Sequence, residues 1–209
     1  MKTQDKKLLF YSIFASILLL SGGFVYNRLA LSRAPEENLP QKTAGIFVGD
    51  PSAPVLIEAY GSFLCPACRQ FTLSTYPQLE KDYILTGKAK MEFFFFPPYE
   101  TGQAALCAQE QDKFPAYQKI AYGNQGLIKD IDSMVFLAEK AGLDKSSFKQ
   151  CLESNKYQAQ TEAWHKEGLD KKITGTPTFF IQDEQSVIPG SYDYSFFQTL
   201  IDSHLNEKP

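Results

Sequence analysis

The sequence predicts an α/β protein in which a strand, a helix and a second strand are followed by a helical block, a strand pair and a closing helix. Short runs rich in β-branched and aromatic residues, Val55–Tyr60 and Ala89–Phe96, lie on either side of a segment whose apolar side chains recur at helical spacing. The chain has 209 residues, 44% of them hydrophobic and 14% aromatic. That size and composition suffice for one domain with a hydrophobic core.

The chain begins with a segment that is long enough to cross a membrane. Three lysines precede Leu8–Tyr26, an uncharged stretch that as a helix would extend about 28 Å at roughly 1.5 Å per residue, close to the thickness of a bilayer core. We predict a cytoplasmic tail at 1–7 and an uncleaved transmembrane anchor at 8–26, since lysines favour the inner side. The alternative is a cleaved signal peptide, because Ser32-Arg33-Ala34 resembles a cleavage site.

Residues 27–43 contain Pro35, Pro40 and charged side chains, which are typical of a tether, and we expect the folded domain at 44–209. Residues 1–43 carry six of the chain's 21 Lys/Arg and three of its 24 Asp/Glu, so the domain carries 15 and 21 and has a formal charge of −6. An acidic domain argues against binding to nucleic acid. The prediction is therefore a single-pass protein of the inner or cytoplasmic membrane whose domain lies on the extracytoplasmic side, periplasmic or at the cell surface.

The first half of the domain predicts a β-α-β unit. Val55–Tyr60 is a strand that ends at Gly61-Ser62, and Arg69–Lys81 is a helix that bends near Pro77. Ala89–Phe96 is a strand buried on both faces, closed by two prolines. A strand–helix–strand order predicts parallel pairing of the two strands with a right-handed crossover.

A helical block is expected from about 101 to 168, followed by strands and a final helix. Asp144 is a candidate N-cap and Gly142 a candidate C-cap within the block. The expected helices of the block are Ala104–Gln111, Pro115–Tyr122, Ile131–Ala141 and a helix from Asp144 to Tyr157; the later elements are strands Thr178–Ile181 and Val187–Ile188 and an amphipathic helix Asp193–Leu205.

Two cysteines stand two residues apart at the predicted start of the first helix: Cys65-Pro66-Ala67-Cys68. Unpaired backbone N–H groups and the positive end of the helix dipole would face the Cys65 sulfur and stabilise a thiolate there. In motifs of this kind the thiol pKa falls to about 3.5–7.5. We therefore predict that Cys65 and Cys68 form a redox-active disulfide, in which Cys65 is attacked by a substrate thiolate and leaves readily afterwards.

Other chemistry for this pair is less favoured by the sequence. An inert disulfide remains an alternative, and zinc would require a second paired set of ligands, which the other two cysteines do not form. His165 and His204 are the only histidines and belong to no hydrolase motif, so we expect both on the surface. No metal and no cofactor are expected.

Thr176-Pro177 precedes the later strand run. X-Pro bonds are the peptide bonds that adopt the cis form at low cost, and together with the cysteine pair we predict cis here. The backbone of Thr176 would then be able to pair with an extended peptide lying beside Cys65.

Three segments resemble the DsbA-like branch of the thioredoxin superfamily: the nine residues from Tyr60 to Cys68, the stretch Gly175–Phe180, and the intervening Cys107–Phe114. The resemblance covers roughly residue 44 to the C-terminus. It implies a thioredoxin-like fold with an inserted helical subdomain and a periplasmic or cell-surface thiol oxidase. By this likeness Cys65 is the nucleophile and Cys68 its resolving partner, while Pro66, Ala67, Thr176 and Pro177 contact the substrate.

Two positions differ from the family pattern. The best-known member has a histidine between its cysteines where this chain has Ala67, and the superfamily often buries an acid at the position of Ala59. Glu58 is the neighbouring residue, but side chains alternate along a strand, so it should face the opposite way.

Cys107 and Cys151 both lie on apolar helical faces. Export permits disulfides, and a structural bridge between the two helices is our first expectation. The alternatives are two unpaired buried thiols or a redox shuttle to Cys65 and Cys68.

The predicted function is a membrane-tethered enzyme, a protein disulfide oxidoreductase that introduces disulfides into exported proteins. Its partners would be exported proteins with reduced cysteines and a quinone-linked membrane oxidase that recycles it. One alternative is a disulfide reductase or isomerase that uses the same pair. Another is a peptide-binding chaperone or assembly factor in which the thiols are incidental.

Overall fold

The computed structural model describes residues 44–182 and 187–206. The predicted tail at 1–7, anchor at 8–26 and linker at 27–43 lie outside these residues. Among the helices that the structure does describe, none has the length and hydropathy of a membrane span.

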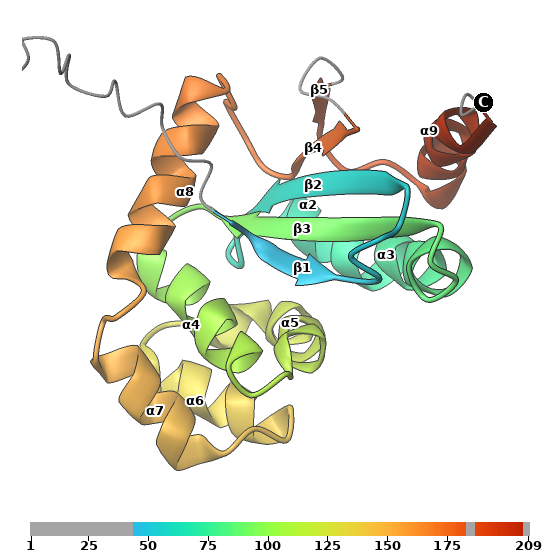
Figure 1. Ribbon diagram of the computed structural model, residues 1–209. Coiled ribbons are helices and arrows are strands. Elements are labelled where there is room, and N and C mark those ends of the chain that lie inside the picture. Colours follow the sequence, from blue (N-terminus) through green and yellow to red (C-terminus); the bar gives the residue numbers. More distant parts are fainter. Residues whose placement is uncertain (1–43, 183–186, 207–209) are drawn as a thin grey trace, which may run out of the picture. The chain divides into compact units, whose positions relative to one another are not determined.

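Within the described ranges, five strands form one sheet in the order β1-β3-β2-β4-β5 (Figure 1). The pairing of β2 with β3 is parallel, which confirms the prediction, and the other three pairings are antiparallel. The strands are β1 (Ile46–Val48), β2 (Val55–Gly61), β3 (Ala89–Phe95), β4 (Thr178–Ile181) and β5 (Val187–Pro189).

Strand β1 was not predicted. It is three residues long and pairs with the edge of β3, and only Ile46 in it is buried. Three residues are too few to show the alternation of apolar and polar side chains by which a strand is recognised.

A helical run from Pro66 to Ile84 connects β2 to β3. It contains α2 (Pro66–Gln70) and α3 (Tyr76–Leu79), each followed by a wider π-helical turn. The Tyr76 N–H bonds to the carbonyl of Phe71, five residues back. This widening comes directly before Pro77, where a proline ring would otherwise clash with the preceding turn.

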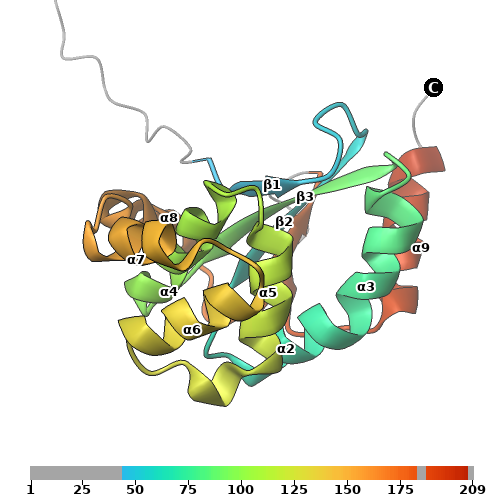
Figure 2. The same cartoon turned by 90° about the horizontal axis from the view of Figure 1, so that it is seen from below.

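Between β3 and β4 the described chain is helical, and one further helix follows β5 (Figures 1 and 2). A short 3-10 turn, Gln125–Leu127, separates two of these helices. The helices are α4 (Tyr99–Gln109), α5 (Phe114–Gly123), α6 (Ile131–Lys140), α7 (Lys145–Glu153), α8 (Gln158–Asp170) and α9 (Tyr194–Asn206).

The prediction of a single helix from Asp144 to Tyr157 is wrong. Asp144 does cap α7, accepting a 2.7 Å hydrogen bond from the Ser147 N–H, but the helix ends at Glu153. Asn155 has a φ of 52°, and a residue in this left-handed conformation cannot continue a right-handed helix. A separate helix, α8, begins at Gln158. It was not predicted from the sequence.

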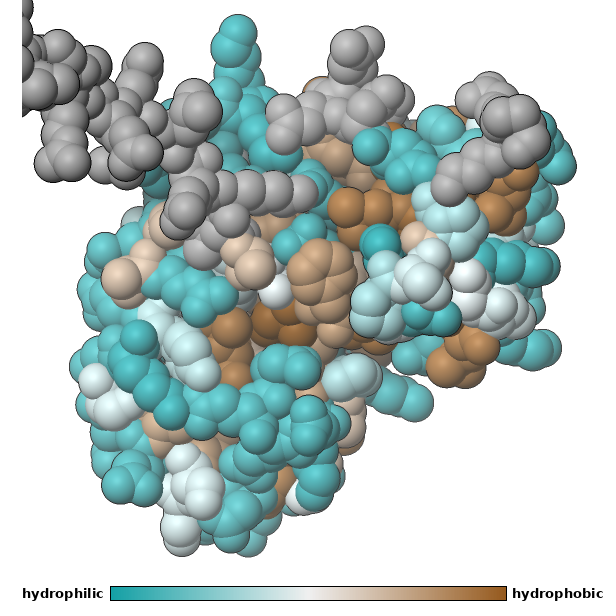
Figure 3. Space-filling model, in the orientation of Figure 1, coloured by the Kyte–Doolittle hydropathy of each residue, from teal (hydrophilic) through white to brown (hydrophobic). Residues whose placement is uncertain are grey.

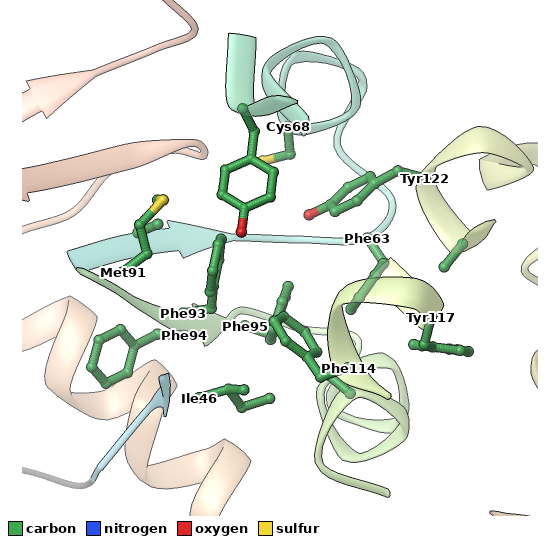
Figure 4. Packing of buried hydrophobic residues seen from close by; sticks show 14 of the residues in the cluster. Ile46, Phe63, Cys68, Met91, Phe93, Phe94, Phe95, Phe114, Tyr117 and Tyr122 are labelled. Atoms are coloured by element: carbon green, nitrogen blue, oxygen red, sulfur yellow. The ribbon is translucent and has the colours of Figure 1, made fainter. Parts of the chain in front are cut away.

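The two faces of the sheet carry different helices. On one face, Phe71 of the π-helical turn packs against Phe179 and Phe197, with ring centroids 4.6 and 5.4 Å apart. On the other face, Trp164 of α8 packs against Phe94 at 6.0 Å. The cysteine pair belongs to the first face, where Figure 4 shows buried aromatic side chains gathered near Cys68.

Figure 3 shows hydrophobic side chains gathered over the strands, whereas hydrophilic side chains cover most of the helical block on this side. Helix α8 approaches the end of β3 closely. A Cβ atom at Gly168 would stand 2.2 Å from the Phe96 ring, so any side chain at this position would force that ring to move.

Candidate active site

Cys65 is the N-cap of α2. After β2 ends at Gly61, the chain turns, and the backbone of Cys65 is extended, with φ −85° and ψ 120°. The Cys68 N–H points back at the Cys65 Sγ, 3.4 Å away. Pro66 stands at the first helical position, where its missing N–H costs no hydrogen bond. The helix therefore begins so that backbone donors face the sulfur of Cys65.

The structure brings Cys65 together with the Thr176-Pro177 segment. The Cys65 thiol donates a 3.1 Å hydrogen bond to the Thr176 carbonyl, across 111 positions of sequence. The Thr176–Pro177 peptide bond is cis. Pro66 is exposed and Ala67 half-buried beside the half-buried Cys65. These residues together surround one accessible sulfur.

The two thiols differ strongly in acidity. Burial by itself would raise the pKa of Cys65, but hydrogen bonds from the Thr176 side chain, from Cys68 and from the Ala67 backbone outweigh it and lower that pKa. Cys68 is 2% exposed, and burial, together with the nearby charge of Cys65, raises its pKa to about 12. Cys65 is therefore the more acidic thiol of the pair, and Cys68 the less acidic one.

Ala59 and Glu58 lie on opposite faces of β2, as the alternation predicted. Ala59 lines a small cavity with Cys68. Glu58 points to the α8 side of the sheet, where its carboxylate is 3.1 Å from the Lys171 Nζ and both side chains are at most 10% exposed. The Glu58 carboxylate therefore does not face Cys68.

Polar contacts from the helical block hold the cysteine loop, the segment from Ser62 to Cys68. These contacts were not predicted from the sequence. The Gln125 amide donates to the carbonyls of Phe63 and Cys65, at 2.7 and 2.9 Å. The Arg69 Nε donates to the Tyr122 carbonyl at 3.0 Å, and the Tyr122 hydroxyl to the Ser62 carbonyl at 3.3 Å. Isolated polar residues of this kind follow no motif, so no signal in one sequence identifies them.

An open groove of about 510 Å³ runs beside Cys65. Apolar side chains, among them Leu64, Phe96 and Leu169, form much of its lining together with Thr176. His165 also lines it with a partly exposed side chain, and its Nδ1 is 2.9 Å from the Tyr99 hydroxyl.

Cys107 of α4 and Cys151 of α7 form a disulfide with a Cα separation of 5.9 Å. Both are buried within the helical block. Over residues 44–182 and 187–206, no group of three or more His, Cys, Asp or Glu side chains is placed to hold a metal ion.

Comparison with known proteins extends over most of the chain. A family model described as thioredoxin matches residues 41–203. The probable disulfide bond formation protein D of Bacillus anthracis is 24% identical, over 99% of this chain and all of that protein. Disulfide bond formation protein D of Bacillus subtilis is also 24% identical, over 77% of this chain and 77% of its own length.

Solved structures share the fold. The crystal structure of Wolbachia pipientis alpha-DsbA1 covers 77% of this chain and 90% of its own, with a TM-score of 0.69 and 24% identity. That of oxidised BdbD from Bacillus subtilis covers 78% of this chain and 98% of its own, with a TM-score of 0.66 and 22% identity. Both likenesses support a thioredoxin-like fold that carries additional helices.

Proposed function

The chain belongs to the thioredoxin family and is a DsbA-like protein disulfide oxidoreductase, and from this premise we propose that it introduces disulfides into exported proteins through Cys65 and Cys68. The observation that carries the proposal is the difference in acidity between the two thiols, the pKa of Cys65 being lowered and that of Cys68 raised. A stabilised thiolate is a good leaving group, and it favours the reduced form of the pair. Such a pair oxidises its substrates.

The reaction has two exchange steps. A substrate thiolate attacks the Cys65 sulfur of the oxidised pair, so that a substrate–Cys65 disulfide forms and the Cys65–Cys68 bond breaks. The electron pair of the broken bond stays on Cys68, which takes up one proton. A second substrate thiolate then attacks the first substrate sulfur and expels Cys65 as a thiolate. Two substrate thiols are oxidised, and the cysteine pair gains two electrons.

Substrate would bind along the groove beside Cys65. Thr176 contributes a carbonyl and its hydroxyl next to the sulfur, and an extended peptide adds to such exposed backbone by main-chain hydrogen bonds. The exposed Pro66 and the half-buried Ala67 border the same sulfur. Pro177, which is buried behind Thr176, would hold this corner in place.

We further propose that residues 8–26 anchor the enzyme in the cytoplasmic membrane, with the tail at 1–7 inside, the linker at 27–43 and the domain at 44–209 outside. The hydrophobic length of the segment supports this, and the disulfide between Cys107 and Cys151 suits an oxidising compartment. A quinone-linked membrane oxidase would restore the Cys65–Cys68 disulfide. In cell fractionation the full chain should sediment with membranes, and a chain that begins at residue 44 and is exported by a cleavable signal should not.

The decisive test is the reduction potential of the Cys65–Cys68 pair, measured in glutathione buffers. We expect a potential at or above that of protein disulfide isomerase, about −180 mV, since a more oxidising pair transfers its disulfide to substrate thiols more completely. A value near thioredoxin's, about −270 mV, would instead indicate the reductase or isomerase. Disulfide formation in cells that Cys65→Ser leaves unchanged would favour the peptide-binding chaperone.

A further inference from the structure

In every reaction cycle Cys68 gains a negative charge when the disulfide opens, although its side chain is buried. When the disulfide opens, the electron pair of the broken bond is left on Cys68, which is 2% exposed. A buried anion with no hydrogen-bond donor is costly. Contacts with the Ser62 backbone and the Thr176 side chain favour the anion, but burial outweighs them and the pKa of Cys68 is still raised to about 12. A further donor near Cys68 would therefore ease the departure of the sulfur.

The Tyr122 hydroxyl is placed for this. Built onto Gly61, a Cβ atom would lie 3.4 Å from the Tyr122 Oη and 3.6 Å from the Cys68 Sγ, so both atoms border the same point above the end of β2. Figure 4 shows the Tyr122 ring beside Phe63 with its hydroxyl directed towards the Cys68 side. The ring is fixed there by stacking on Phe63, with centroids 4.8 Å apart.

A small cavity borders both groups. A cavity of about 20 Å³ is lined by Cys68, Tyr122, Gln118 and Thr72, and otherwise mainly by apolar side chains such as Ala59. The hydroxyl's bond to the Ser62 carbonyl is 3.3 Å long, beyond the usual range for O–H···O bonds. The hydroxyl can therefore turn to the sulfur without losing a strong partner.

We infer that the Tyr122 hydroxyl donates a hydrogen bond to the Cys68 sulfur as the disulfide opens, and so stabilises the departing thiolate. The inference rests on the proposed redox role of the cysteine pair. Tyr122 itself keeps its proton, because burial and the neighbouring charges of Cys68 and Cys65 raise its pKa well above the ordinary value. It acts as a donor of a hydrogen bond, and the proton that Cys68 takes up replaces the one that the substrate thiol lost.

The chain provides a matched control on the same helix. Tyr117 is also buried in α5 and also packs against Phe63, at 5.9 Å, but its hydroxyl forms no hydrogen bond with any residue of the described part of the chain. The variants Tyr122→Phe and Tyr117→Phe each remove one buried hydroxyl. Only the first removes a hydroxyl that borders Cys68.

The test measures how fast reduced glutathione opens the disulfide of each oxidised protein. Tyr122→Phe should slow this step about tenfold, the effect of losing one charge-assisted hydrogen bond, and Tyr117→Phe should stay within about twofold of wild type. Alkylation of Cys65 by iodoacetamide in the reduced proteins should be unchanged in both variants. A merely structural role of Tyr122 would alter that alkylation as well. Thermal midpoints check that both variants keep the fold.

Equal rates in wild type and Tyr122→Phe, or equal slowing in both variants, would overturn the inference. A wild-type protein whose Cys65–Cys68 disulfide is not opened by glutathione would overturn the proposed function itself. The two failures are distinguishable, because the first leaves wild-type exchange intact.

Discussion

The side-chain amide of Gln125 donates a 2.9 Å hydrogen bond to the carbonyl oxygen of Cys65. The same amide nitrogen donates to the Phe63 carbonyl at 2.7 Å. Gln125 begins the turn between α5 and α6, so one side chain of the helical block fixes the backbone on both sides of Leu64. The position of the reactive sulfur therefore depends on a residue outside the sheet and its crossover helix.

Replacing Gln125 with Met should loosen the cysteine loop while keeping the size of the side chain. We expect disulfide exchange with a peptide substrate to slow about fivefold, since small displacements of reacting groups reduce rates strongly. Two lost hydrogen bonds should also lower the free energy of unfolding by about 1–2 kcal/mol. Stopped-flow exchange and urea unfolding measure the two effects.

Gln111→Met is the control for this change. Gln111 also bridges backbone with its amide, accepting from the Asp144 N–H at 2.7 Å and donating to the Asp144 carbonyl at 3.3 Å. It is half-buried like Gln125 but lies at the joint between α4 and α7. Stability should fall by a similar amount with no change in exchange rate. Equal slowing by both variants would contradict a specific role of Gln125.

Thr176→Val should raise the pKa of Cys65. Burial pushes that pKa upward, and the hydrogen bond from Thr176 is the first of the contacts that lower it below the ordinary value of 9.0. The rate of Cys65 alkylation follows the thiolate fraction, so in wild type it should rise with pH through a midpoint below 9.0. In the variant the midpoint should move up, and alkylation at pH 7 should be slower.

The lowered pKa of Cys65 also makes the stability of the reduced protein depend on pH. Because the folded-state pKa of Cys65 is lowered, the thiolate's contribution is fully present above the unfolded-state pKa and is lost as the pH falls through the folded-state value. Thr176→Val should reduce this contribution. Thr178→Val is the control, since that hydroxyl bonds to the Gly175 carbonyl at 2.8 Å; an equal pKa change in both variants would refute the assignment to Thr176.

The sequence predicted those parts of the site whose cause is local. The spacing of Cys65 and Cys68 at a helix start, and the side-chain alternation that separates Ala59 from Glu58, are properties of neighbouring residues. Gln125 and Tyr122 contact the cysteine loop only because the helical block folds back against it. Their contacts join residues about sixty positions apart. They depend on how the helices pack, and no periodic pattern in the sequence indicates which distant segment a helix will contact.

In the fold as well, features with a local cause were predicted and features that depend on tertiary context were not. The strands β2, β3 and β4 are strongly apolar and were predicted close to their observed bounds. The end of α7 depends on one residue, Asn155, in a left-handed conformation, and asparagine adopts that conformation only in some contexts. The helix boundary was therefore not predictable from composition.

Replacing both Cys107 and Cys151 with Ala should destabilise the domain without abolishing exchange. The disulfide closes a loop with a sequence separation of 44, for which the chain-entropy model gives about 4 kcal/mol as an upper figure. Urea unfolding should show a loss of about 2–4 kcal/mol. Glutathione should still open the Cys65–Cys68 disulfide at the wild-type rate. A complete loss of exchange in a folded double variant would instead support a redox shuttle between the two pairs.

Lys171→Met should be among the most destabilising single changes on the face of the sheet opposite the cysteines. The Lys171 Nζ is 3.1 Å from the Glu58 carboxylate, with both side chains at most 10% exposed, and it lies 4.8 Å from the centre of the Phe180 ring. Lys171→Met removes the lysine of a buried ion pair together with its contact to the Phe180 ring, and breaking a buried pair in this way costs about 3–5 kcal/mol. Urea unfolding at pH 7 measures this loss.

Lys166→Met, in the helix whose C-cap is Lys171, compares an exposed ion pair with the buried one. Lys166 pairs with Asp170 at 3.0 Å, but the two side chains are 72% and 59% exposed, and exposed pairs of this kind contribute at most about 1 kcal/mol. The double variant Glu58→Gln, Lys171→Met should recover part of the stability lost in Lys171→Met, because it no longer leaves a buried carboxylate without its lysine. Equal losses from Lys166→Met and Lys171→Met would mean that the Glu58–Lys171 pair contributes no more than a surface contact.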